Sequence, residues 1–150
     1  MSPLFKKLNL GARDIIHVLD APASIEPELG ALEGVAIERT VAGKVGFALA
    51  FVVTQAQLDE ASSRLVASAE GDAILWMVYP KGSSRNYKCE FNRDSGWAVL
   101  GAAGFEPVRM VAVDEDWSAL RFRRVEHIKS ITRSPARVIS RAGKSRAAPR

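Results

Sequence analysis

The sequence is poor in the residues that build cross-links and metal sites. Its 150 residues contain one cysteine and two histidines. A single cysteine excludes a disulfide within the chain, and so few thiol and imidazole groups argue against a zinc site made of cysteine and histidine. We therefore expect no metal centre, and a reducing compartment such as the cytoplasm.

Long apolar runs are also absent. The two longest, Phe47 to Val53 and Ala73 to Tyr79, have the length of β-strands and fall far short of the ~20 residues that a membrane-spanning helix needs. Residues 1–7 contain two lysines but no apolar segment of the kind found in secretory signals. These absences predict a soluble, cytoplasmic protein.

The end of the chain has no acidic residue. All 17 acidic residues lie in 1–126 beside 14 of the 21 lysines and arginines, so this part has a small excess of negative charge. Residues 127–150 hold the other seven cations, mixed with Ser, Ala, Gly and Pro. The pattern predicts a folded domain over 1–126 and a flexible basic tail over 127–150.

What the sequence does contain is an alternation of strand and helix signals. Thr54 and Gln57 are spaced as a capping box, which marks the start of a helix that we expect to end at Gly71. A short helix is expected from Ser24 to about Leu32, and another is expected to begin at Asn92 or Asp94. The expected strands lie at 15–19, 35–41, 47–53, 73–79, 108–113 and 119–124.

This order of elements predicts the topology. Strands separated by helices pair in parallel through right-handed crossovers, and the short turn at 114–118 makes the last strand antiparallel. The sequence therefore predicts an α/β, three-layer, Rossmann-like domain with a mostly parallel sheet and a final antiparallel strand. Polar and apolar residues alternate over 119–124, which favours an edge strand.

Several polar residues follow the predicted strands at one edge of this sheet. Ligands of open parallel sheets bind outside the carboxyl ends of the strands. We therefore expect a ligand site among Asp20, Lys81, Ser83, Arg93, Asp114, Trp117 and Ser118. A purely structural interpretation competes with this one, in which Asp114 and Asp116 form the turn and Trp117 covers the core.

Two blocks of the chain resemble an uncharacterised bacterial family, known only as a domain of unknown function. They are Tyr79-Pro80-Lys81 with Asn92-Arg93-Asp94, and Asp114-Glu115-Asp116-Trp117-Ser118-Ala119-Leu120-Arg121-Phe122. The resemblance covers about residues 8–124 and implies no established activity. The order of elements also resembles the C-terminal half of class I S-adenosylmethionine-dependent methyltransferases, which is a likeness of fold and does not imply function.

The residues that hold S-adenosylmethionine in such folds are not evident. A glycine-rich turn normally follows the first strand, because glycine lets the backbone approach the ligand. Here the turn is Asp20-Ala21-Pro22-Ala23, and proline offers no N–H. An acidic residue is expected at the end of the second strand, where the chain has Thr40-Val41-Ala42-Gly43. We therefore expect no cofactor.

Other common chemistries lack their motifs as well. The sequence has no phosphate-binding P-loop and no Gly-x-Ser-x-Gly nucleophile turn. His17 lies within an apolar strand, which favours a hydrogen-bonded core histidine. Cys89 lies near Lys88 and Arg85, whose charges favour a lowered thiol pKa.

Three functions therefore remain open. The first is a non-catalytic domain that binds a small anionic ligand or a protein partner at the carboxyl edge of the sheet. The second is an S-adenosylmethionine-dependent methyltransferase with a divergent cofactor site. The third is contact with nucleic acid through the tail cations Lys129, Arg133, Arg137 and Arg141. Whether the chain is an enzyme is left open, and the missing motifs favour a binding protein.

Overall fold

The structure is a computed structural model, and it describes residues 3–128. The predicted flexible tail lies almost wholly beyond these residues. The four tail cations assigned to nucleic-acid contact, Lys129, Arg133, Arg137 and Arg141, therefore lie outside the described residues. Within the part described, no helix is long and apolar enough to cross a membrane.

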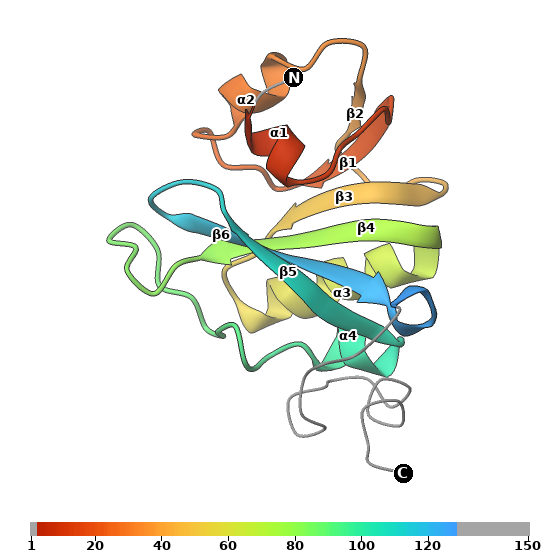
Figure 1. The fold of residues 1–150 in the computed structure, drawn as a ribbon. Helices are drawn as coiled ribbons and strands as arrows, with labels where there is room; N and C mark the ends of the chain where they lie inside the picture. The colour runs from red at the N-terminus through yellow and green to blue at the C-terminus, as the bar shows by residue number, and fades with distance from the viewer. Residues whose placement is uncertain (1–2, 129–150) are drawn as a thin grey trace.

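A six-stranded sheet forms the centre of the molecule (Figure 1). Its strands are β1 (Ile15–Leu19), β2 (Ala36–Glu38), β3 (Val45–Phe51), β4 (Ala69–Pro80), β5 (Phe105–Ala112) and β6 (Trp117–Arg124). They lie in the order β2-β1-β3-β4-β6-β5. The pairs among the first four are parallel, whereas β6 is antiparallel to both β4 and β5. The predicted mostly parallel sheet with an antiparallel last strand is confirmed.

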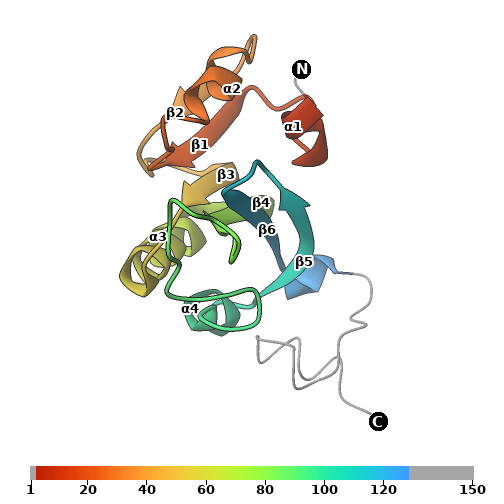
Figure 2. The same cartoon turned by 90° about the vertical axis from the view of Figure 1, so that its left-hand side faces the viewer.

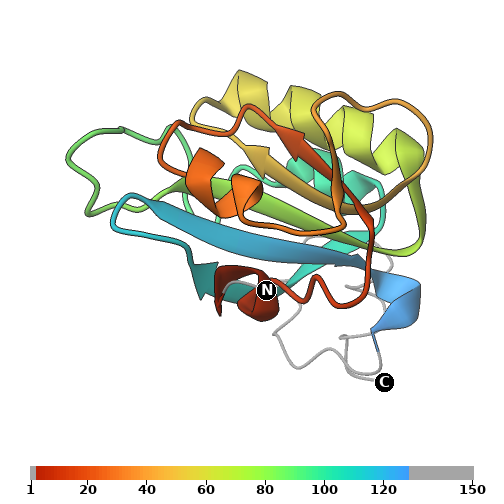
Figure 3. The ribbon, with the colours of Figure 1, turned by 90° about the horizontal axis from the view of Figure 1, so that it is seen from above.

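Helices cover both faces of the sheet, which confirms the three-layer arrangement (Figures 2 and 3). α1 (Pro3–Lys7) and α2 (Glu26–Gly30) pack on one face, with Phe5 and Leu29 in its apolar core. α3 (Gln55–Ser68) and α4 (Ala98–Ala102) pack on the other, with Leu58, Leu65 and Leu100 in a second core. Two layers of buried side chains therefore enclose β3 and β4.

The long helix α3 begins where its sequence predicts. The Thr54 hydroxyl accepts the Gln57 backbone N–H at 3.1 Å, and the Gln57 side-chain oxygen Oε1 accepts the Thr54 backbone N–H at 3.1 Å. This reciprocal capping box satisfies two backbone donors that the first helical turn would otherwise leave free. The cap also places the start of α3 at the carboxyl edge of the sheet, directly after β3.

The prediction that the last strand is an edge strand was wrong. β6 lies between β4 and β5, and β5 is the edge strand on that side. Leu120 and Phe122 are buried in the core on the α3 side, whereas Arg121 and Arg123 on the other face are half-buried. The alternation of polar and apolar residues therefore indicates that one face of β6 is incompletely covered. It does not indicate whether the strand lies at the edge of the sheet.

Several boundaries also differ from the prediction. α4 starts at Ala98, because the Asn92 side chain accepts the N–H of Asp94 and closes a local turn instead of capping a helix. α3 ends at Ser68, and Gly71, with φ +56°, lies within β4. β2 ends at Glu38, three residues before the predicted end at Val41.

His17 is buried, as predicted for a core histidine, but the predicted hydrogen bond is absent. Neither ring nitrogen has a partner among the described residues. His17 lies opposite Glu38 and Ala48 in the sheet register, on the face that packs against α3. The imidazole is therefore buried without a polar partner among the described residues.

Candidate functional site

A cavity of about 920 Å³ lies at the carboxyl end of β4. After Pro80 the chain leaves the sheet and runs as a loop to α4 (Figure 1), and this loop forms most of the cavity wall. Met110 of β5 and Ser118 of β6 complete it. The cavity therefore lies at the edge of the sheet where the sequence predicts a ligand site, on the side formed by β4, β5 and β6.

Asp116 holds the first half of this loop against the β5–β6 turn. Its carboxylate accepts hydrogen bonds from the Ser84 hydroxyl at 2.8 Å and from the Asn86 amide at 3.1 Å. Its carbonyl oxygen accepts the Lys81 N–H at 2.7 Å. The Tyr87 ring also packs on Trp117, with 4.8 Å between ring centroids. These contacts give residues 81–87 a defined path across the turn.

The start of α3 holds the second half of the loop. The Gln55 N–H donates to the Glu90 carboxylate at 2.8 Å, so this acid occupies a free backbone donor of the helix. The Gln55 side-chain amide donates to the Gly96 carbonyl oxygen, also at 2.8 Å. Gly96 has φ +101°, a conformation that favours glycine. One glutamine thus fixes the loop at two points.

The cavity wall is rich in positive charge. It contains four cationic side chains and one carboxylate, that of Glu90, which already accepts the Gln55 N–H. The cations are Lys81, Arg85, Lys88 and Arg93. Because the described part of the chain has more acidic than basic residues overall, this concentration is local. It creates a positive potential at the mouth of the cavity.

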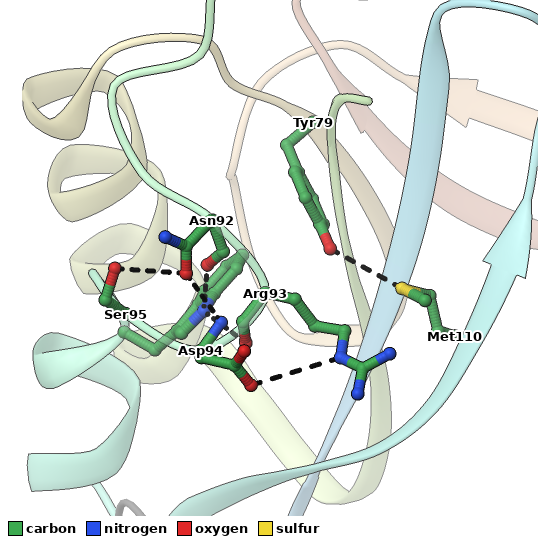
Figure 4. Close-up of polar contacts among 7 residues, drawn as sticks. Tyr79, Asn92, Arg93, Asp94, Ser95 and Met110 are labelled. Carbon is green, nitrogen blue, oxygen red and sulfur yellow. Dashed lines mark hydrogen bonds and ion pairs between the residues drawn. The ribbon is translucent and has the colours of Figure 1, made fainter. Parts of the chain in front are cut away.

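Tyr79 lies at the inner end of the cavity (Figure 4). Burial raises the pKa of its hydroxyl, and the nearby Arg93 charge acts in the opposite direction. The hydroxyl is therefore a neutral donor, which donates to the Met110 sulfur at 3.5 Å. Because a thioether is a weak acceptor, this O–H is available to a better acceptor. The Arg93 side chain extends toward β5, the strand that carries Met110 (Figure 4). Its Nε lies 4.0 Å from the Asp94 carboxylate.

The structure brings together some of the predicted site residues. Lys81, Arg93 and Ser118 line the cavity, whereas Asp20, Ser83, Asp114 and Trp117 are not among its lining residues. Lys81 and Trp117 do lie at the same edge, since Pro80 pairs with Trp117 in the register.

Asp114 and Trp117, two of the other predicted residues, make structural contacts. The Asp114 carboxylate accepts the N–H groups of Asp116 and Trp117, which shapes the hairpin turn. Trp117 is buried against Phe51 and Tyr87. For these two residues the structural interpretation describes the observed contacts. Asp20, with φ +56°, directly follows β1 and does not line the cavity.

Sequence reasoning did not assign Tyr79, Met110 or two of the four loop cations, Arg85 and Lys88, to the site. Tyr79 ends the apolar run 73–79, and nothing in the sequence shows that its hydroxyl reaches the cavity. Cys89 also lines the cavity, but burial raises the pKa of its thiol, contrary to the predicted lowering. The available signal was the presence of four cations within residues 81–93. A single loop that starts at the sheet edge brings such charges close to one another.

Comparison with solved structures shows a methyltransferase-like fold. The chain superposes on TrmN from Thermus thermophilus with a TM-score of 0.51 and 8% sequence identity, over 81% of this chain and 47% of that one. It also resembles the N-methyltransferase NodS from Bradyrhizobium japonicum (TM-score 0.49, 14% identity, 81% and 92% covered). A methyltransferase from Aquifex aeolicus described as SAM-dependent gives a TM-score of 0.47 at 15% identity, with 81% and 88% covered.

These likenesses show the fold alone. The chain spans about half the length of the first solved structures that it matches. No protein-family model matches the sequence, and no curated protein matches it. The solved structures therefore support the Rossmann-like, methyltransferase-like architecture and leave the activity of this chain to be argued from its own residues.

The residues after β1 do not form the usual cradle for S-adenosylmethionine. Pro22 has no N–H to offer, and its carbonyl oxygen accepts the Ile25 N–H, while that of Ala23 accepts the Glu26 N–H. The turn therefore continues directly into α2. An acidic residue does end the second strand, because β2 ends at Glu38 and not at the predicted Val41. An acidic residue at this position does not make the usual site without the glycine-rich turn.

Proposed function

We propose that this chain is a binding protein for a small anionic molecule, which it holds in the cavity under residues 81–96. The proposal rests on one observation: four cations line the cavity, and the one carboxylate among its lining residues, that of Glu90, already accepts the Gln55 N–H. Lysine and arginine side chains attract carboxylates and phosphates and bind them with charge-assisted hydrogen bonds. The neutral Tyr79 hydroxyl supplies a further donor at the inner end.

The blocks that resemble the uncharacterised bacterial family support this placement. Tyr79 to Lys81 and Asn92-Arg93 line the cavity, and the block from Asp114 to Phe122 forms the turn and strand against which the loop packs. If the chain is a member of that family, as we also propose, the resemblance lies mainly in the elements that build this cavity.

Replacing Lys81 and Arg93 together with glutamine should weaken anion binding at least tenfold. Each charge-assisted hydrogen bond contributes about 1.5–3 kcal/mol, and about 1.4 kcal/mol corresponds to a factor of ten in affinity. Binding is measured by calorimetry and thermal shift with inorganic phosphate, citrate and a nucleoside monophosphate.

The matched control replaces Lys44 and Arg64 with glutamine. These exposed side chains form surface ion pairs with Glu70 and Glu60, so the same total charge is removed away from the cavity. The control should bind the anions like the unmodified protein. Equal affinities for the cavity variant and the unmodified protein would refute the proposed site.

A second function is an S-adenosylmethionine-dependent methyltransferase with a divergent cofactor site. The structural comparisons support this function better than the first, because the TrmN superposition shows the same fold. Glu38 at the end of β2 favours it as well. The turn containing Pro22 argues against it, since it lacks the donors and the space that the cofactor would need.

Titration with S-adenosylmethionine separates the two functions. Because the turn after β1 lacks the glycine-rich cradle, we expect no saturable heat in calorimetry. Saturable binding that weakens in a Glu38→Gln variant would instead establish the methyltransferase alternative. In that case the cavity under residues 81–96 would become the candidate site for the methyl acceptor.

A further inference from the structure

A second group of positive side chains lies on the face of the sheet that packs against α1 and α2. Arg109 of β5 and Arg121 of β6 are Cα partners, so their side chains share a face. Arg123 follows two residues later on the same strand and therefore shares it too. Arg13, in the turn before β1, has its guanidinium 5.9 Å from the centre of the Phe47 ring, in the core on that face. We call these four residues the arginine face.

Most of the charge of the arginine face is not neutralised. Arg123 pairs with the Asp72 carboxylate at 2.6 Å. Among residues 3–128, no carboxylate forms an ion pair with Arg13, Arg109 or Arg121. The Nε of Arg121 is buried and has no hydrogen-bond partner in that range. Proteins rarely leave such a donor unsatisfied.

The neighbours of Arg121 indicate the same shortage of negative charge. Burial lowers its pKa first, and the charges of Arg123, Arg13 and Arg109 lower it further. Asp72 acts in the opposite direction and does not compensate. Glu106, opposite Arg123 in the register, is buried and already has an interaction. An anion from outside the chain would therefore relieve repulsion among the four arginines.

The end of the described chain lies beside this surface. The 3-10 helix η1 (Val125–His127) follows directly after β6, and His127 lies close enough to Asp72, the partner of Arg123, to affect the pKa of its carboxyl. The remaining residues, 129–150, contain seven cations and no acid. Because like charges repel, this segment is not a suitable partner for the arginine face. Together with the arginine face, these seven cations favour binding of a polyanion over a single small anion.

We infer that the arginine face binds double-stranded nucleic acid through its phosphates. Arginine suits this contact because its planar guanidinium matches the geometry of phosphate oxygens. The large apolar side chains exposed in the described part of the chain are Ile15, Tyr87, Val108 and Met110. The single aromatic ring among them, that of Tyr87, lines the cavity. A surface without exposed rings suits a duplex backbone better than unstacked bases.

The test measures binding of the full-length chain to a fluorescent DNA duplex and an RNA duplex, by polarisation at several salt concentrations. An Arg109→Gln/Arg121→Gln variant should bind both duplexes at least tenfold more weakly. The slope of log affinity against log salt should decrease by about 2, since two phosphate contacts are lost. The Lys44→Gln/Arg64→Gln control should bind like the unmodified chain.

Two further measurements can refute the inference. A variant with the tail residues Lys129, Arg133, Arg137 and Arg141 changed to glutamine measures the contribution of the tail. If this variant loses all duplex binding while the Arg109→Gln/Arg121→Gln variant keeps it, the arginine face is not the site. Stronger binding to vesicles of acidic phospholipid than to either duplex would also overturn the inference. Circular dichroism checks that each variant is folded.

Discussion

Replacing Trp76 with alanine will lower the free energy of unfolding by about 3–5 kcal/mol, the usual range for removing a large buried aromatic side chain. Trp76 lies in the middle of β4 and is fully buried among Phe5, Leu8 and Phe47. Its indole N–H donates to the Leu8 carbonyl oxygen at 2.9 Å. The side chain therefore attaches the N-terminal segment to the sheet, and its loss opens a cavity between them.

Urea denaturation followed by far-ultraviolet circular dichroism measures this effect. Trp76→Phe is the matched variant, since it keeps most of the apolar volume and removes the indole donor. It should cost less than Trp76→Ala, with about 1–3 kcal/mol for the Leu8 carbonyl left without its partner. If Trp76→Ala unfolds at the same urea concentration as the unmodified protein, the packing of α1 described above is incorrect.

Replacing Gly96 with alanine should destabilise the protein by about 2–4 kcal/mol, because backbone strain and overpacking add at this position. A Cβ atom there would lie 2.7 Å from the Cβ of Phe91 and 2.8 Å from the Gln55 side-chain oxygen. The φ of +101° is also one that side chains disfavour. Phe91 cannot move freely, since it packs against Tyr79 and Trp97.

Gly82→Ala provides the control within the same loop. No atom lies within 4 Å of a Cβ placed there, so its stability should stay within about 0.5 kcal/mol of the unmodified protein. Thermal unfolding compares the two variants, and hydrogen exchange at residues 81–96 shows whether the loop is released. Equal unfolding temperatures for both variants would contradict the close packing of Gly96 against Gln55 and Phe91.

The cavity under residues 81–96 shows where sequence reasoning stops. The sequence predicts that the segment after β4 lies at the carboxyl edge, because strand direction follows from the alternation of strands and helices. It places Lys81 and Arg93 there correctly. It does not predict that Gln55 and Asp116 fold the loop into a wall, because these hydrogen bonds join residues 30 or more positions apart.

The grouping of residues in the arginine face is even less predictable from the sequence. Arg121 and Arg123 alternate with apolar residues, and this pattern alone is compatible with any strand that has one wet face. Their proximity to Arg109 depends on the register between β5 and β6, which shifts between Pro107 and Arg109. Such a shift moves side chains between faces, so the grouping follows from the pairing.

By itself the sequence determined the class of fold, the direction of the strands and the capped start of α3. These features depend on local periodicity and on chain connectivity, which are present in the order of the residues. The tertiary structure decided which strand occupies the edge, which polar groups are left without partners and which cations share a surface. Those outcomes depend on distances between residues remote in the chain, and such distances exist only once the layers have packed.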